Sequence, residues 1–516
     1  MESRPGRRVP ATAVAEARRR RWGATRHDQF REPGDGGGSS RQARGRRGPV
    51  RQKPQAPEAH GGLDQAERHV VERFGEDATA RRRAARKNQW LRSKAPSARF
   101  GARGRGRRSV HAPQSQIDFK NDAPVSTCEG LSTAMDDTYA RPRDRHLFSP
   151  GRKRILSLDG GGVRGAVSIA FLERIEHVLA DIEGRDVRLC EYFDLIGGTS
   201  TGAIIAAGLA TGFSAGEIHT FYERLAPKVF RSSMFHLPGW HANFDGAALH
   251  EELDRTFSGC TLGSEKLKTG LCMVLKRLDT GSCWIVMNNP RSVFWETPQD
   301  NSFVGNSYLS LPDVIRASTA APYYFDPQTI EIVKGMEPGL FLDGGLTPHN
   351  NPSLALFLTA VLPPYRLEWK TGVDDLFILS VGTGSYRPKL TTREAQRAPS
   401  LLLAINALAA QISDNQELTL TLMSWLGQSS LPWPINSELG DLKDATPPFG
   451  KLFHFHRCDI KLEQQWLTQN VGVTLSADDI VKLRQMENPD NIPSLYSFGK
   501  IAAEKQITHE LLERAL

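Results

Sequence analysis

Residues 154–165 read RILSLDGGGVRG, and this stretch decides the fold. The apolar run at 155–158 is typical of a buried strand, and the glycines that follow end it. Beyond the glycines, apolar side chains recur at helical spacing from Val167 to Leu179. A short buried strand that passes through a glycine turn into a helix is the repeating unit of α/β proteins with parallel sheets.

The same unit recurs further along the chain. An apolar run at 193–196 enters GGTSTG at 197–202, and the small apolar residues at 203–209 predict a closely packed helix. We therefore predict an α/β fold in which a mainly parallel central sheet is sandwiched by helices. Further strand-like runs lie at 271–275, 283–287, 340–342 and 376–381.

The first part of the chain has a different composition. Residues 1–110 hold about 29 Lys and Arg against about 11 Asp and Glu, so they carry roughly +18. The whole chain has a net charge of +8, so the remainder lies near −10. Large apolar side chains are few there, and burial cannot offset the loss of chain entropy. We predict that residues 1–148 form an Arg/Gly-rich, mostly disordered extension.

Nucleic acid is not an expected partner of this chain, except through the basic extension, whose charge suits nucleic acid or anionic lipid. A solvated tail is the alternative interpretation. A second alternative is an upstream extension ahead of a start at Met135.

Nothing in the sequence indicates a secreted or membrane-spanning protein. The six cysteines are scattered without C-x-x-C pairs or zinc-like His spacing, which favours a reduced compartment. No signal-peptide core follows the N-terminal charges, and the longest apolar runs fall short of the ~20 residues needed to cross a bilayer. We expect a cytoplasmic protein with at most transient peripheral contact with a membrane surface.

Residues 198–202 read GTSTG and match the G-x-S-x-G pattern of a nucleophile elbow. Gly198 and Gly202 permit a tight turn there. Ser200 then stands at the start of a helix, whose dipole favours a developing oxyanion. The alternative is a glycine-rich turn that only allows the helix to pack closely. The strand-to-helix context makes Ser200 the candidate nucleophile.

Gly160, Gly161 and Gly162 open the first helix and expose backbone N–H groups that suit either a phosphate or an oxyanion. Arg164 adds a fixed cation beside them, although a surface ion pair also explains it. No Gly-Lys-Ser/Thr follows, which excludes a Walker A loop. The G-x-G-x-x-G spacing, with Asp181 downstream, keeps a dinucleotide-binding alternative open.

A third signal, DGG at 343–345, follows a predicted strand. A lone Asp-Gly turn is most often only a turn. Ser200 otherwise lacks a base, however, so Asp343 is the candidate proton acceptor. His349, six residues further on, is the runner-up.

Together these motifs resemble those of the patatin-like phospholipases. The set is DGGGVRG at 159–165, GTSTG at 198–202 and DGG at 343–345, in this order. Three ordered motifs are far more specific than any one of them. The resemblance places a catalytic core at 149–390 and a helical C-terminal part of the same domain at 391–516. Supporting stretches are ASTAAPYYF at 317–325, NNP at 350–352 and VGTG at 381–384.

The resemblance implies a serine lipid acyl hydrolase of the phospholipase A or lysophospholipase type, which releases fatty acid through an acyl-enzyme intermediate. Its substrate is a lipid ester, and neither a metal nor another cofactor takes part. Ser200 and Asp343 form the implied catalytic dyad, without a histidine. The other implied site residues are the oxyanion hole, Gly160, Gly161 and Gly162 with Arg164, and the supporting glycines Gly198, Gly202, Gly344 and Gly345.

Two other classes of function stay open. The chain also resembles bacterial patatin-like effectors that cyclic nucleotides switch on, which implies an enzyme regulated by a nucleotide. The other class is a non-catalytic protein that binds lipid or nucleic acid, because the glycine loop and the basic extension both suit anions.

Overall fold

The computed structural model describes residues 141–229, 246–387 and 392–514. Within them, nine strands form one mixed sheet in the order β5-β6-β3-β2-β1-β7-β9-β8, and β4 also pairs with β3. Most neighbours are parallel, which confirms the predicted α/β fold. The strands are β1 (Lys153–Leu158), β2 (Leu195–Thr199), β3 (Gly270–Arg277), β4 (Cys283–Met287), β5 (Gln328–Ile330), β6 (Gly339–Asp343), β7 (Leu376–Val381), β8 (Gly427–Gln428) and β9 (Phe453–Cys458).

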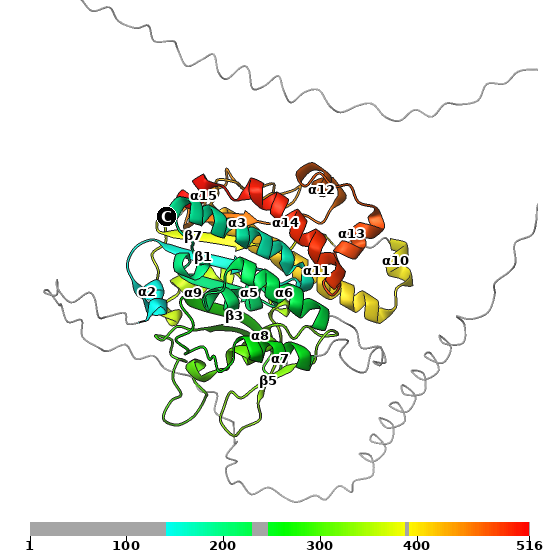
Figure 1. Cartoon of the computed structure of the whole chain (residues 1–516). Helices are drawn as coiled ribbons and strands as arrows, with labels where there is room; N and C mark the ends of the chain where they lie inside the picture. The colour runs from blue at the N-terminus through cyan, green and yellow to red at the C-terminus, as the bar shows by residue number, and fades with distance from the viewer. Residues whose placement is uncertain (1–140, 230–245, 388–391, 515–516) are drawn as a thin grey trace, which may run out of the picture. The chain divides into compact units, whose positions relative to one another are not determined.

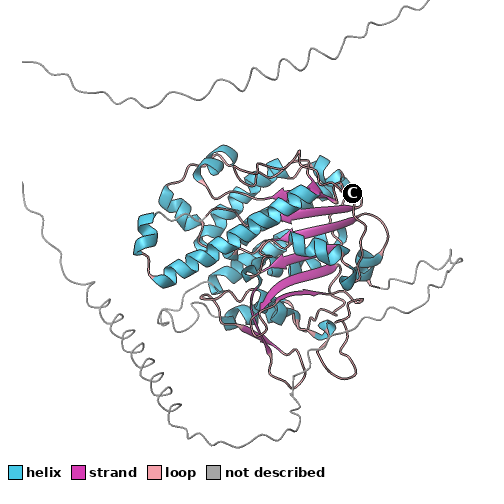
Figure 2. Ribbon diagram, turned by 180° about the vertical axis from the view of Figure 1, so that it is seen from behind, coloured by secondary structure: helices cyan, strands magenta, loops and turns pink. Residues whose placement is uncertain are grey.

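Helices lie on both faces of this sheet (Figure 1, Figure 2). On one face α3 packs along α14 and α6, while α9 and α11 pack on the other. The helices are α2 (Pro142–Phe148), α3 (Gly165–Glu183), α4 (Leu189–Tyr192), α5 (Thr201–Ala210), α6 (Ala215–Val229), α7 (Gly246–Thr256), α8 (Leu311–Ser318), α9 (Ser353–Val361), α10 (Thr392–Arg397), α11 (Ser400–Leu426), α12 (Gln464–Asn470), α13 (Ala477–Leu483), α14 (Ile492–Gln506) and α15 (His509–Glu513).

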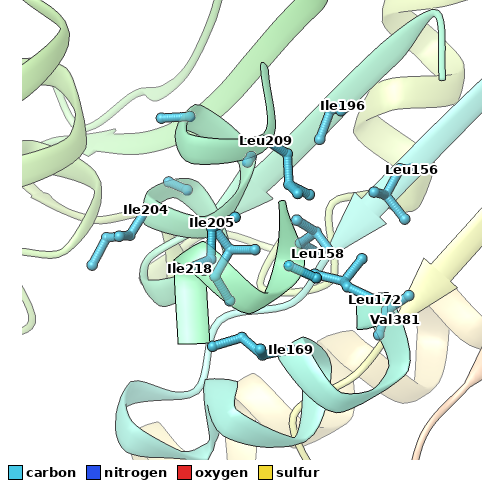
Figure 3. Close-up of a cluster of buried hydrophobic side chains, with 14 of the residues drawn as sticks. Leu156, Leu158, Ile169, Leu172, Ile196, Ile204, Ile205, Leu209, Ile218 and Val381 are labelled. Carbon is cyan, nitrogen blue, oxygen red and sulfur yellow. The ribbon is translucent and has the colours of Figure 1, made fainter. Parts of the chain in front are cut away.

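Strand β1 explains why the strands of this protein are continuous apolar runs. Successive side chains of a strand point to opposite faces, and both faces are covered here. Ile155 therefore belongs to one hydrophobic cluster, whereas Leu156 and Leu158 belong to the other. Figure 3 shows part of the latter cluster, in which Leu158 lies near Ile169 of α3 and Ile205 of α5.

Two strands end against the same edge of β3. β2 runs parallel to β3 and ends with Thr199 opposite Val274, while β6 runs antiparallel and ends with Asp343 opposite Leu275. β4 pairs with both Val274 and Leu275, so β2 and β6 must share the other edge. A Cβ on Gly344 would lie 2.1 Å from the Val274 carbonyl oxygen, so only glycine allows the approach. The ends of β2 and β6 are therefore adjacent.

The last residues of the stretch that the sequence assigned to the extension form a helix. Pro142–Phe148 form helix α2, which contacts β3. Leu147 is fully buried, and its carbonyl accepts a hydrogen bond from the Trp369 indole. Pro142 starts this helix, and the burial of Leu147, together with the half-burial of Phe148, favours its order. The predicted disorder and polyanion binding of residues 1–140 lie outside the described residues.

Among the residues that the structure describes, no helix combines the length and the hydrophobicity that crossing a bilayer demands.

Candidate active site

Ser200 stands on a sharp turn between β2 and α5. Its backbone lies in the left-handed region, with φ of 55°, which is strained for a residue with a side chain. The turn is possible because glycines stand two positions before and two positions after Ser200: a Cβ on Gly198 would lie 2.0 Å from the Gly202 carbonyl oxygen. On Gly202 a Cβ would lie 2.3 Å from the Leu158 carbonyl oxygen of β1. The turn raises the Ser200 hydroxyl above the end of the sheet.

Asp343, at the end of β6, meets this hydroxyl. Ser200 Oγ lies 2.6 Å from Asp343 Oδ2, a short and charge-assisted hydrogen bond. The other carboxylate oxygen, Oδ1, accepts the Gly345 N–H at 2.7 Å. The structure thus brings together the two residues that the sequence analysis selected, from positions 143 apart in the chain.

Burial sets the proton affinity of this carboxyl. Asp343 is 6% exposed, and desolvation raises its pKa to about 6. The hydrogen bonds from Ser200 and Gly345, and the positive charge of Arg316, act in the opposite direction. A carboxylate with this pKa is ionised at neutral pH and a better base than an ordinary aspartate.

The runner-up base, His349, has no contact of this kind. Its backbone carbonyl accepts a hydrogen bond from Thr199 Oγ1, while its ring Nδ1 is buried without a hydrogen-bond partner among the described residues. Burial also lowers the pKa of its imidazole. The histidine supports the turn through its main chain.

The glycine loop after β1 lies beside Ser200. A Cβ on Gly160 would lie 3.2 Å from the Ser200 Cβ. The Gly160 N–H already donates to the Asn350 carbonyl at 3.0 Å, so it is not free to bind an oxyanion. Within the described part of the chain, the backbone N–H groups of Gly161 and Gly162 have no protein acceptor. The geometry therefore narrows the predicted oxyanion hole to Gly161 and Gly162.

Arg164 is buried and holds this loop in place. Its Nη1 donates to the Gly384 carbonyl at 3.1 Å and its Nε to the Gly161 carbonyl at 3.4 Å. The guanidinium also lies over the ring of Tyr386, 5.3 Å from its centroid. Its donors are thus partly committed to backbone carbonyls, and it is more a support for the loop than a surface ion pair.

A buried ionic network anchors the same loop from below. Arg457 of β9 is fully buried and donates to both oxygens of Asp159, at 3.0 and 2.6 Å, and to Asp459 at 2.8 Å. Burial lowers the pKa of Arg457, but the charges of the two carboxylates outweigh this and raise it. Asp159 immediately precedes the three glycines, and Asp459 accepts the Gly384 N–H at 2.8 Å. One guanidinium thus joins the glycine loop to the loop after β7.

A second support acts on the nucleophile turn. The Ser200 N–H donates to Ser318 Oγ at 3.0 Å, and the Ser318 hydroxyl donates to the Val274 carbonyl at 2.8 Å. Ser318 is fully buried at the end of α8. Its hydroxyl therefore ties the strained backbone of Ser200 to β3.

The dyad opens into a cavity of about 810 Å³. One wall is apolar and comes from α5, α6 and α7, with Ile204, Leu225, Val229 and Leu249. Other parts of the lining come from α11, α13 and the loops after β7 and β9. Across residues 141–229, 246–387 and 392–514, no cluster of three or more His, Cys, Asp or Glu is placed to hold a metal ion.

Several supporting residues were not selected from the sequence. Arg457 and Asp459 lie in FHFHRCDI at 453–460, where a charged residue inside a buried strand signals an ionic partner. Ser318 carries no such local signal, because its role depends on a neighbour 118 positions away.

Comparison with known proteins shows which family and which relatives this chain is similar to. A family model described as patatin-like phospholipase matches residues 156–357. A cGAMP-activated phospholipase of Escherichia coli (strain TW11681) is 33% identical over 237 residues, 45% of this chain and 62% of the relative. A cUMP-AMP-activated phospholipase of Escherichia coli is 30% identical over 247 residues, 47% and 69% of the two chains. Patatin-like protein 3 of Arabidopsis thaliana is 29% identical over 267 residues, which cover 45% of this chain and 59% of the relative. The chain thus spans less than two thirds of the first of these relatives.

The buried network yields a prediction about stability. Arg457→Met leaves two carboxylates buried without their cation, and we expect the free energy of unfolding to fall by about 3–5 kcal/mol. Urea denaturation followed by circular dichroism measures this change. Arg188→Met, which removes an exposed pair with Glu217, is the matched control and should change stability little. Equal losses in the two variants would contradict the structural role of Arg457.

Proposed function

Because the chain belongs to the patatin-like phospholipase family, we propose that it is a serine lipid acyl hydrolase that cleaves carboxylic esters of membrane lipids and releases fatty acid. The observation that carries the proposal is the 2.6 Å contact between the Ser200 hydroxyl and the Asp343 carboxylate at the floor of a partly apolar cavity. A nucleophile hydrogen-bonded to a base is the arrangement that covalent catalysis requires.

In the first step Ser200 Oγ attacks the ester carbonyl carbon while Asp343 takes the hydroxyl proton. Even with its raised pKa, a carboxyl is too weak a base to produce a free alkoxide beforehand, so attack and proton transfer occur together. The short hydrogen bond already places the proton along this path. Ser200 sits at the start of α5, whose positive dipole end favours the negative charge that develops.

The carbonyl oxygen becomes an oxyanion, for which the N–H groups of Gly161 and Gly162 are the candidate donors. Each donor of this kind is worth roughly 3 kcal/mol in the transition state. Protonated Asp343 returns the proton to the leaving alcohol, and an acyl-enzyme remains on Ser200. A water then attacks the acyl carbon and gives its proton to Asp343. As the bond from the acyl carbon to Ser200 Oγ breaks, Asp343 passes this proton to Oγ, which frees the fatty acid and restores both residues.

The cavity wall supports an acyl chain as the bound group. Ile204, Leu225, Val229 and Leu249 offer apolar side chains next to the dyad, and burial of each methylene contributes about 0.8 kcal/mol. A lipid ester therefore suits this site better than a polar ester does.

The dyad is tested by two substitutions. Ser200→Ala removes the nucleophile and Asp343→Asn removes the base while preserving shape, and we expect each to lower turnover by about 10³-fold or more. The measurements are hydrolysis of a p-nitrophenyl acyl ester and of phosphatidylcholine, with folding checked by circular dichroism. His349→Gln is the control, and should retain activity because its ring does not contact Ser200. Equal activity in the wild type and both dyad variants would reject the proposed function.

The pH dependence tests the role of the carboxylate separately. Only ionised Asp343 accepts a proton, and its pKa is raised to about 6, so kcat/KM should fall as the pH drops through about 6. If the aspartate had an ordinary pKa of about 4, the enzyme would keep its activity to a pH about two units lower. A pH series on a soluble ester, after a check that the protein remains folded, gives the apparent pKa. A flat profile down to about pH 4 would argue against a buried carboxylate base.

A second candidate is that a cyclic nucleotide regulates this hydrolase. Two of the relatives are phospholipases described as activated by cGAMP and by cUMP-AMP. The lining of the cavity also includes cations that lie over aromatic rings. Arg484 lies 4.9 Å from the centroid of Tyr386, and Lys461 lies 5.5 Å from that of Trp433. In such pairs the cation suits a phosphate group and the aromatic ring suits a nucleotide base.

If this regulation operates, cGAMP or cUMP-AMP should raise the ester hydrolysis rate by about tenfold or more, the size of a typical allosteric coupling. The assay compares the rate with each cyclic dinucleotide and with an equal amount of AMP and GMP as the control. Another outcome is an enzyme that hydrolyses esters at a rate that neither cyclic dinucleotide changes. That result would contradict the proposed regulation but not the proposed hydrolase activity.

A further inference from the structure

The opening of the cavity is built from apolar side chains. A residue that lines a cavity and is also solvent-exposed lies where the cavity meets the surface. Tyr323, Leu408 and Val481 satisfy both conditions, with exposed fractions of 54%, 42% and 59%. We call these three residues the rim. They come from the loop after α8, from α11 and from α13, so the apolar character is not a property of one helix.

The rim is held in position by contacts within the protein. The ring of Tyr323 packs edge-on against Tyr324, with centroids 5.3 Å apart, and Tyr324 donates to Glu487 in the segment after α13. Tyr323 has a backbone φ of 75°, which is uncommon for a bulky residue. Strain of this kind persists only where the surroundings hold it, and here it presents an aromatic ring to solvent.

The charges around the opening favour a lipid surface. Among the described residues, the other exposed members of the cavity lining are Pro322, Arg387 and Gln485, and three half-buried glutamates, Glu417, Glu463 and Glu487, also line the cavity. Two of these glutamates have partners within the protein: Glu417 pairs with Arg387, and Glu487 accepts a hydrogen bond from Tyr324. Moving an ionised carboxylate out of water is costly, whereas tyrosine and arginine are both tolerated at a membrane interface.

We propose that the rim inserts into the surface of a lipid bilayer and seats the cavity opening against it. This rests on the proposed function, because a lipid ester must then leave the membrane and reach Ser200. With the rim in the bilayer, an acyl chain enters the cavity without crossing water. A protein bound at the rim would instead close this route, so the bilayer is the occupant that the position of the rim favours.

The test replaces the three rim residues with polar residues that are compatible with the backbone conformation at each position. Leu408→Gln and Val481→Gln keep helix-forming residues in α11 and α13, and Tyr323→Asn keeps a residue that tolerates positive φ. The matched control is Val293→Gln, Tyr308→Asn and Met336→Gln, which changes exposed residues that do not line the cavity. Thermal unfolding checks that both triple variants are folded.

Binding is measured by flotation with phosphatidylcholine vesicles, in the full chain carrying Ser200→Ala to prevent hydrolysis. Neutral vesicles and about 0.5 M salt suppress attraction through the basic N-terminal residues. We expect the rim variant to lose binding at least tenfold and the control variant to bind as the parent does. Hydrolysis is measured in chains that keep Ser200. The rate on phospholipid vesicles, divided by the rate on a soluble ester, should fall by the same factor in the rim variant and stay unchanged in the control variant.

The outcomes separate the two proposals. Equal flotation of the rim and control variants, or equal loss in both, would overturn the rim as the docking surface, even if Ser200 and Asp343 prove essential. A protein that hydrolyses neither soluble ester nor phospholipid refutes the proposed function instead. Loss of flotation in the rim variant alone supports the docking surface by a readout that does not depend on turnover.

Discussion

The edge of strand β3 is the constraint on which the active site depends. β2 reaches this edge from one direction and β6 from the other, and they end opposite Val274 and Leu275. Ser200 follows the end of β2 and Asp343 ends β6, so the hydroxyl and the carboxylate are close because the two strand ends are adjacent. The absence of a side chain on Gly344 is what allows this approach. A parallel β6 would have directed Asp343 away from Ser200.

The charged and strained elements of the site form a connected structure. The strained turn at Ser200 is tied to β3 by the Ser318 hydroxyl, and the glycine loop is tied to β9 by Arg457. Such supports maintain the positions of reacting groups before substrate binds, which is how electrostatic catalysis avoids reorganisation during the reaction. Their loss affects the dyad without removing any atom that reacts.

Burial underlies both the raised pKa of Asp343 and the apolar lining of the cavity. The same desolvation that raises the pKa of Asp343 comes from the layers of helices that also supply an apolar cavity wall. A water-filled crevice would leave the aspartate with an ordinary pKa and favour no acyl chain. The proposed base and the proposed acyl-binding wall are therefore two consequences of one packed environment.

The sequence by itself determined the α/β class, most strand positions and the glycine-flanked Ser200, because these depend on local periodicity and on turn chemistry. It also identified Asp343, through motif order. Only the tertiary structure decided that Gly160 is not a free donor, that helix α2 joins the folded domain, and that Ser318 and Arg457 support the site. These are contacts between distant segments, and no local pattern encodes which distant partner a hydroxyl, an N–H group or a guanidinium will meet.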